Sequence, residues 1–347
     1  MRTNKRFLLS VLMILTLMIT LVACGADESS PETTGDSEGG TLVVYSGRNE
    51  ELVGPLIEQF KEKSGIEVQV KYGSTSEMAA TILEEGNNSP ADIYYGQDAG
   101  ALGALSKAGR FEPLPDALLS KVESRFRSPK GEWIGTSGRA RVVVYNTEAL
   151  SEEDLPESIL DYTDPKWKGQ IGWAPANGSF QAFVTALRMT EGEEVAREWL
   201  KGIQANEPKV YPKNTPILEA VGSGEIAVGF VNHYYLLRKL DEVGESYPAR
   251  NQFSGNSDIG GLINVAGVGI VNSRKHKKEA QAFVEYLLSE DAQAYFRDET
   301  SEYPLVTGVQ GREELPPLSD LQTPDIDLSD LDDLEGTLEL LQELGIL

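Results

Sequence analysis

Residues 41–70 read TLVVYSGRNEELVGPLIEQFKEKSGIEVQV and contain a complete strand–helix–strand pattern. The β-branched, apolar run TLVVY is typical of a buried strand. Apolar residues between 52 and 60 then recur at helical spacing, and Gly65 ends the helix just before a second strand, IEVQV. A strand, a helix and another strand in this order predict a mostly parallel α/β sheet.

The start of that helix can be placed in two ways. Asn49 is a suitable N-cap, with Glu50 and Glu51 in the first turn. Pro55 fits best at a first helical position and favours a start near Gly54. The sequence leaves both starts open.

The alternation of strands and helices continues along the chain. We expect further strands at 91–95, 140–145, 170–173, 225–230 and 262–271, and further helices at 76–86, 98–108, 180–190, 193–203, 215–222, 277–289 and 334–344. No internal repeat and no long linker interrupts this series. The sequence therefore predicts an α/β fold with two lobes in close contact.

The N-terminus has the plan of a secretory signal peptide. Basic residues at positions 2, 5 and 6 precede an apolar run from 7 to 23, which is shorter than the roughly 20 residues of a membrane span. The sequence LVACG (21–25) resembles the lipobox of bacterial lipoproteins, which implies cleavage before Cys24 and lipidation of Cys24. This assigns 1–23 to a signal peptide and 24–40 to the lipidated cysteine and a flexible, polar tether.

Cysteine usage agrees with this assignment. Cys24 is the one cysteine in the sequence, and lipidation gives an odd exported cysteine a role. The alternative, an uncleaved N-terminal anchor, also places the rest of the chain outside the cytoplasm. We expect an extracytoplasmic protein that contacts the cell membrane through its lipid anchor only.

The net charge of the chain argues against some classes of binding partner. The chain carries 55 acidic and 31 basic residues, a net charge of −24. Nucleic acids and anionic membrane surfaces both reward clusters of Lys and Arg, so neither is an expected partner. An acidic surface is compatible with attracting cations, but it more often keeps a protein soluble.

Two adjacent tyrosines, Tyr234 and Tyr235, follow the strand predicted at 225–230. In an open α/β sheet, ligands bind beyond the carboxyl ends of the strands. Phenolate oxygen is hard and anionic, which suits a hard trivalent cation, and a bound cation offsets the cost of ionising a phenol whose pKa is about 10. Packing at the lobe interface is the alternative interpretation. Tyr94 and Tyr95, inside a predicted strand, are expected in the core.

A second group of residues has the character of an anion site. Asn177, Gly178 and Ser179 precede the helix predicted at 180–190, and a helix N-terminus offers unpaired N–H groups and a positive dipole end. A plain N-cap fits these residues equally. Arg139 and Arg141 lie at a predicted lobe boundary, where they either bind an anion, serve the hinge or pair with surface acids.

Enzyme signatures are absent from the sequence. It contains no glycine-rich phosphate loop, no H-E-x-x-H and no G-x-S-x-G motif. An activated nucleophile cannot be assembled from its residues either. We therefore expect a binding protein and not an enzyme.

Six blocks of sequence carry a resemblance to a known family. They are VYSGRNEE (44–51), ADIYYGQDAG (91–100), SGRARVVVYN (137–146), DPKWKGQIGW (164–173), NHYYL (232–236) and SEYPL (301–305). In this order they resemble bacterial ferric-ion-binding proteins, the substrate-binding components of iron(III) ABC importers. The resemblance runs from about residue 41 to about residue 310.

The resemblance implies two lobes of the periplasmic-binding-protein kind, joined by hinge strands, with the ligand in the cleft between them. One lobe would comprise 41–139 together with 264–310. The other would comprise 140–263, with the C-terminal segment 311–347 packing on it. Ligand binding would close the lobes.

The resemblance also implies the binding residues. Tyr234 and Tyr235 match the family's iron-binding tyrosine pair. An exogenous anion, carbonate or phosphate, completes the iron shell in this family. Its contacts match Asn177, Gly178, Ser179, Asn214 and Asn232, and Arg48 matches an arginine that contacts carbonate in some members.

The chain departs from the family at three positions. One branch adds a histidine ligand where this chain has Asn49, and a glutamate ligand where it has Gln97. Another branch adds a third tyrosine where this chain has Phe180. Asp98, beside Gln97, is a possible substitute ligand if the loop is shifted by one residue.

The implied function is capture of ferric iron as cargo, with a synergistic anion, for delivery to the transmembrane subunits of an ABC permease. We expect a monomer. Because a fold does not fix a ligand, the alternative is a binder of an organophosphonate, another small anion or a ferric chelate. The two interpretations differ in whether the anion site works without metal.

Overall fold

The computed structural model describes residues 40–347. The predicted signal peptide, the lipidation site at Cys24 and the tether up to residue 39 lie outside the described residues. Within residues 40–347, no helix combines the length and the apolar character that crossing a bilayer requires.

The strands form one hydrogen-bonded sheet. They are β1 (Leu42–Ser46), β2 (Val68–Tyr72), β3 (Ile93–Gly96), β4 (Ile134–Asn146), β5 (Ile171–Trp173), β6 (Lys209–Val210), β7 (Val228–Asn232), β8 (Ala249–Gln252), β9 (Ile263–Ile270) and β10 (Tyr303–Pro304). Their order is β2-β1-β3-β9-β4-β7-β5-β6, and β8 and β10 also pair with β4. The α/β prediction is confirmed, with parallel pairing within β1–β3 and within β5–β7.

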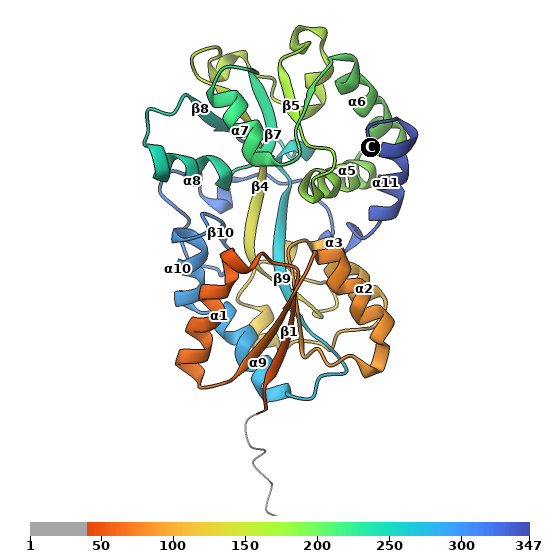
Figure 1. Cartoon of the computed structure of the whole chain (residues 1–347), viewed down its shortest axis with the longest axis vertical. Helices are drawn as coiled ribbons and strands as arrows, with labels where there is room; N and C mark the ends of the chain where they lie inside the picture. Colours follow the sequence, from red (N-terminus) through yellow and green to blue (C-terminus); the bar gives the residue numbers. More distant parts are fainter. Residues whose placement is uncertain (1–39) are drawn as a thin grey trace, which may run out of the picture. The chain divides into compact units, whose positions relative to one another are not determined.

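Strand β4 joins two lobes. Its first part, Ile134 to Ala140, pairs with β9, and its second part, Arg141 to Tyr145, pairs with β7. Every residue of β4 is buried. Lobe 1 is built around β1–β3, lobe 2 around β5–β7, and β4 and β9 run between them (Figure 1).

Helices cover both lobes. Lobe 1 carries α1 (Glu50–Ser64), α2 (Thr75–Glu85), α3 (Ala99–Lys107), α4 (Asp116–Leu119), α9 (Lys277–Leu287) and α10 (Glu290–Asp298). Lobe 2 carries α5 (Gly178–Thr190), α6 (Glu193–Ala205), α7 (Asn214–Gly222), α8 (Tyr234–Val243) and α11 (Leu334–Glu343). The predicted helices are all present, with ends that differ by only a few residues.

The structure distinguishes between the two predicted starts of helix α1. It begins at Glu50, and the Asn49 side chain accepts a hydrogen bond from the Glu51 N–H at 3.0 Å. The start near Gly54 is therefore wrong. Pro55 lies inside the helix, where it removes one backbone hydrogen bond near the N-terminal end.

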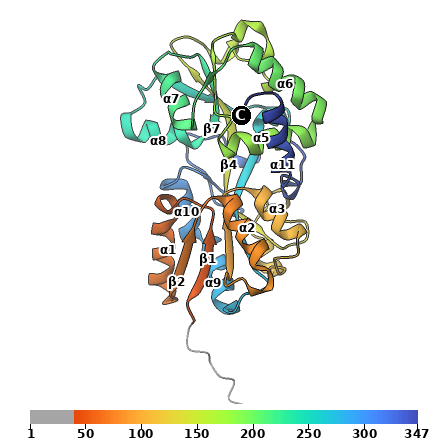
Figure 2. The ribbon, with the colours of Figure 1, turned by 45° about the vertical axis from the view of Figure 1, so that its right-hand side comes forward.

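The C-terminal segment contacts both lobes (Figure 2). Leu328 and Leu331 are buried, and Ser329 Oγ accepts a hydrogen bond from the indole N–H of Trp133 at 3.2 Å in lobe 1. The following helix, α11, packs on α5, where the hydroxyls of Thr185 and Thr337 lie 2.7 Å apart and are buried. The segment therefore passes from α3 in lobe 1 to α5 in lobe 2.

Glycines in α3 permit this passage. A methyl group at Gly103 would overlap the carbonyl oxygen of Ser329, and one at Gly100 would overlap that of Leu331. Both neighbours are backbone atoms and cannot rotate away. The C-terminal segment thus requires glycine at these positions.

We predict that Gly103→Ala destabilises the protein by about 1–3 kcal/mol, because the added methyl group must push the 329–331 backbone off α3. Urea unfolding of the iron-free protein measures this change. Gly255→Ala is the matched control, since a methyl group there meets no atom within 4 Å. Equal stabilities of the two variants would contradict the packing described here.

Candidate metal and anion site

The tyrosine pair opens helix α8. Strand β7 ends at Asn232, and α8 begins at Tyr234. The rings of Tyr234 and Tyr235 stack with their centroids 4.3 Å apart and 27° between their planes. Burial raises the pKa of Tyr234 well above its ordinary value, Tyr235 adds to the rise, and the charge of Arg139 opposes it. Tyr234 therefore holds its proton at neutral pH unless a cation displaces it.

His233 fixes the pair to the crossing strand. Its backbone N–H donates to the Ala140 carbonyl at 3.0 Å, and the Ala140 N–H donates to His233 Nδ1 at 3.1 Å. Because Nδ1 accepts, Nε2 carries the proton and donates to the Ser301 carbonyl at 3.0 Å. The ring is fully buried. Its place beside the tyrosines is the one signal in the sequence that could have pointed to this role of His233.

A buried ion pair lies beneath this site. Arg48 Nη1 and Nη2 donate to the two carboxylate oxygens of Glu302, each at 2.9 Å, and Ser137 Oγ donates to Glu302 at 2.7 Å. Burial alone would raise the pKa of Glu302, but Arg48 lowers it below its ordinary value. Arg48 Nη1 also donates to Gln97 Oε1 at 3.0 Å. Both Nη atoms of Arg48 bind protein acceptors, and its buried Nε has none among residues 40–347, so the anion contact expected of Arg48 stays a prediction.

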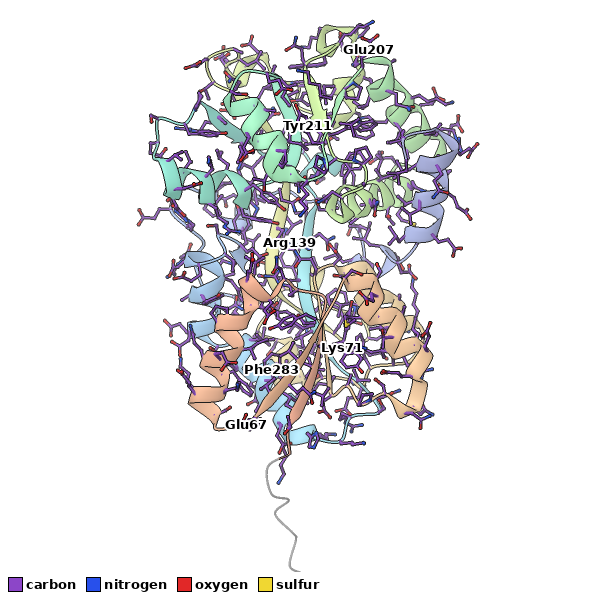
Figure 3. All side chains as sticks on the ribbon, viewed as in Figure 1. Glu67, Lys71, Arg139, Glu207, Tyr211 and Phe283 are labelled. Atoms are coloured by element: carbon purple, nitrogen blue, oxygen red, sulfur yellow. The ribbon has the colours of Figure 1, made fainter. Side chains whose placement is uncertain are left out.

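Asp98 is held from both crossing strands. Its Oδ1 accepts from Arg139 Nη2 at 3.0 Å and from Asn264 Nδ2 at 3.2 Å. Arg139 also donates to the backbone carbonyl of Gln97. Arg139 is almost fully buried and lies in the middle of the molecule, between the lobes (Figure 3).

Arg141 is a buried cation with unused donors. Its Nη2 donates to the Phe230 carbonyl at 3.0 Å, but no acceptor among residues 40–347 reaches its Nε or Nη1. The guanidinium lies over Phe180 and Phe183, 5.7 and 5.5 Å from their ring centroids. Burial lowers the pKa of Arg141 to about 9. Such a group costs folding free energy and favours the arrival of an anion.

Three of the residues predicted at the anion, Asn177, Ser179 and Asn214, are brought together in lobe 2. Asn177 Oδ1 accepts from the Ser179 N–H at 3.0 Å and from the Ser179 hydroxyl at 2.6 Å, so Asn177 is the N-cap of α5, and the anion contact stays a prediction. Asn214 Nδ2 donates to Ser179 Oγ at 3.1 Å. Asn232 is the register partner of Arg141 across β7 and β4.

Two of the positions where the family varies carry side chains with structural contacts. Phe180 is fully buried and packs edge-on against Trp173, at 5.5 Å between ring centroids. It is a core residue beneath Arg141. Asn49 is exposed, and its side-chain oxygen caps α1.

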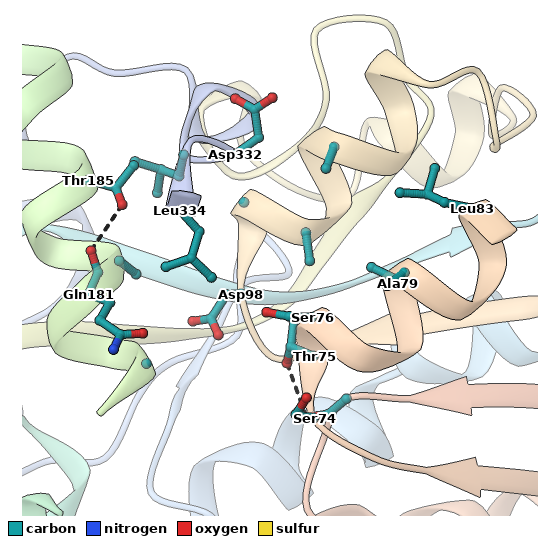
Figure 4. Close-up of a pocket in the computed structure, with 18 residues that line it drawn as sticks. Ser74, Thr75, Ser76, Ala79, Leu83, Asp98, Gln181, Thr185, Asp332 and Leu334 are labelled. Carbon is teal, nitrogen blue, oxygen red and sulfur yellow. Dashed lines mark hydrogen bonds between the residues drawn. The ribbon is translucent and has the colours of Figure 1, made fainter. Parts of the chain in front are cut away.

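A cavity of about 590 Å³ lies between α2, α3, α5 and the C-terminal segment (Figure 4). Its lining includes Ser74, Ser76, Asp98, Gly178, Gln181 and Leu334. Asp98 and Gly178 thus belong both to this cavity and to the groups of residues described above. Within the described residues, His, Cys, Asp and Glu form no cluster of three that could hold a metal ion.

Comparison with known proteins places the chain in a family. Residues 88–329 match the model of the bacterial extracellular solute-binding proteins. The chain is 35% identical to the major ferric iron-binding protein of Neisseria meningitidis serogroup A over 308 residues, which covers 88% of this chain and 93% of that protein.

Solved structures agree with the sequence comparison. Iron-bound HitA from Pseudomonas aeruginosa has a TM-score of 0.81 and 35% identity, with 88% of this chain and 99% of that chain covered. The Trichodesmium protein IdiA (FutA), in complex with iron and citrate ligands, has a TM-score of 0.77 and 30% identity, with 88% and 99% covered.

We predict that His233 makes stability depend on pH. Burial lowers the pKa of His233 to about 4, compared with 6.5 in an exposed histidine. Between these values the unfolded chain binds a proton that the folded chain does not. The stability contributed by neutral His233 is therefore present above pH 6.5 and is lost as the pH falls toward 4, by up to about 1.4 kcal/mol per pH unit.

The measurement is the unfolding free energy of wild type and His233→Gln across this range. We expect the variant to lose less stability than the wild type as the pH falls, because it lacks the titrating ring. Parallel curves would show that His233 does not contribute.

Proposed function

The chain belongs to the bacterial extracellular solute-binding proteins, and from that premise we propose that it captures ferric iron and delivers it to an ABC importer. The observation that carries this proposal is the stacked pair Tyr234–Tyr235 at the start of α8, next to buried guanidiniums. Two phenolates offer hard, anionic oxygens to a hard cation. Both relatives with solved structures described above are iron-bound proteins.

Charge supports an exogenous anion as part of the cargo complex. Arg48, Arg139 and Arg141 are buried around the site, whereas Asp98 and Glu302 supply the two facing carboxylates. One positive charge is left over, and Arg141 has unused donors. We propose that carbonate or phosphate binds at Asn177–Ser179, Asn214, Asn232 and Arg141 and completes the iron shell.

Iron binding would compete with protons. The pKa of Tyr234 lies well above its ordinary value in the iron-free protein, so its proton must leave when iron binds. Tyrosinate ligation therefore weakens as the pH falls, and acid releases the cargo.

The hinge would lie where β4 changes partners. Pairing passes from β9 to β7 between Ala140 and Arg141, which supports lobe boundaries near 139/140 and 263/264. For residues 311–347 we propose a divided role, since 328–332 contact lobe 1 and α11 contacts lobe 2. Closure of the lobes over iron would follow the hinge motion of periplasmic binding proteins.

The remaining features of the proposal concern the cell surface. We propose that the mature protein is an extracytoplasmic monomer, tethered through lipidated Cys24, and that it presents its iron-loaded form to the permease subunits of the importer. The LVACG motif at 21–25 supports the lipid anchor.

The proposal is tested by titrating residues 26–347 with Fe³⁺ and recording visible absorption, with and without carbonate or phosphate. We expect a coloured, saturable complex that needs the anion. Tyr234→Phe and Tyr235→Phe should each lose most iron binding, because each removes one phenolate, with little change in unfolding temperature.

Tyr211→Phe is the matched control. Its hydroxyl donates to the exposed Glu225 at 3.0 Å in lobe 2, away from Arg139 (Figure 3). This variant should bind iron as the wild type does. Unchanged iron affinity in both Tyr234→Phe and Tyr235→Phe would remove the proposed iron site.

A further inference from the structure

Lobe 1 offers three side chains as candidates for a further iron ligand, and two of them are engaged. Asn49 Oδ1 caps α1 by accepting from the Glu51 N–H. Gln97 Oε1 accepts from Arg48 Nη1 at 3.0 Å, and Arg48 is itself locked to Glu302. Both neutral oxygens therefore have a structural partner already.

Asp98 differs because its side chain does not cap the helix that it precedes. It is the N-cap residue of α3, where an Asp side chain normally accepts from the first turn of the helix. Its side chain makes no such bond. Asn264 Oδ1 accepts from the Ala99 N–H instead, at 3.2 Å. The carboxylate of Asp98 is thereby released from capping.

One oxygen of Asp98 is fixed and the other is available. Arg139 and Asn264 face each other across β4 and β9, and both donate to Oδ1. Among residues 40–347, none donates to Oδ2. The side chain is 22% exposed and lines the cavity, where it lies between Gln181 of α5 and Ser76 of α2 (Figure 4).

Two consecutive residues of β4 position Asp98 and the tyrosine pair. Arg139 holds Asp98, and Ala140 exchanges two hydrogen bonds with His233, which precedes Tyr234. Arg139 is also close enough to Tyr234 for its charge to oppose the rise in the tyrosine pKa. Asp98 and the phenols are therefore positioned from the same point of the hinge strand.

We propose that Asp98, through Oδ2, is the ligand that lobe 1 contributes to the ferric iron bound by Tyr234 and Tyr235. This inference rests on the proposed iron function. A carboxylate oxygen is a harder and more strongly charged donor than the amide oxygens of Asn49 or Gln97, which suits a trivalent cation. Closure of the lobes would then add an anionic ligand from the face opposite the tyrosines.

The test compares Asp98→Asn with wild type in iron loading, in the wavelength of the tyrosinate-to-iron absorption band, and in the rate of iron loss to excess citrate. Asparagine keeps an acceptor for Arg139 and Asn264 but removes the anionic oxygen. We expect the band to remain but to shift, and iron to be lost at least about tenfold faster.

Asp332→Asn is the matched control. Asp332 lines the same cavity, but its carboxylate pairs with Lys107 at 2.7 Å. This variant should keep the wild-type band and the wild-type rate. An Asp98→Asn protein with the same band and rate as wild type would overturn the inference while leaving the tyrosine site intact. A wild type that shows no band at all would instead overturn the iron function.

Asp98→Glu carries the test if Asp98→Asn unfolds below the assay temperature. Glutamate keeps the charge but moves it by one methylene group. A folded variant that retains iron, with both a shifted band and a changed rate of iron loss to citrate, supports coordination by the residue at 98. An unshifted band in the folded variant overturns the inference.

Discussion

Strand β4 changes its hydrogen-bonding partner in the middle of its length, and the rest of the molecule depends on this change. Residues up to Ala140 belong to the pairing with β9, and residues from Arg141 onward to the pairing with β7. The three residues at this point, Arg139, Ala140 and Arg141, therefore contact different parts of the site. Arg139 binds Asp98, and Ala140 binds His233, which precedes the tyrosines. Arg141 keeps two nitrogen atoms, Nε and Nη1, without an acceptor among residues 40–347.

The site contains three buried arginines, Arg48, Arg139 and Arg141, and they are an unfavourable arrangement for the stability of the fold. A buried guanidinium without a full set of acceptors destabilises the fold. Arg48 and Arg139 are compensated by Glu302 and Asp98, but Arg141 has only a backbone carbonyl and two aromatic rings. The iron-free site thus carries an excess of one positive charge, which an exogenous anion would neutralise. Arg141 therefore lowers the stability of the iron-free protein, and binding of the anion would restore it.

Local sequence patterns predicted most of the helices and strands. The site, in contrast, is formed by contacts between residues that are far apart in the sequence. The strand–helix alternation placed β1, α1 and β3 well, and Tyr94 and Tyr95 are fully buried as expected. The first half of β4 was missed because Gly135 to Gly138 are small or polar and show no strand pattern, although β9 and β10 bury them. Glu302 could not be paired with Arg48, since 254 residues separate them and only the fold brings them together. Tyr234 and Tyr235 were identified because they follow a predicted strand and match the tyrosine pair of the family that the sequence resembles.

The position of iron in a crystal of the iron-loaded protein, located by its anomalous scattering, shows directly whether Tyr234 and Tyr235 bind the cargo. We expect one strong peak between the hydroxyls of Tyr234 and Tyr235, on the side that faces Asp98, with density for a small anion toward Asn177–Ser179. Iron bound only at surface carboxylates, with both tyrosine hydroxyls free, would contradict the proposed iron site.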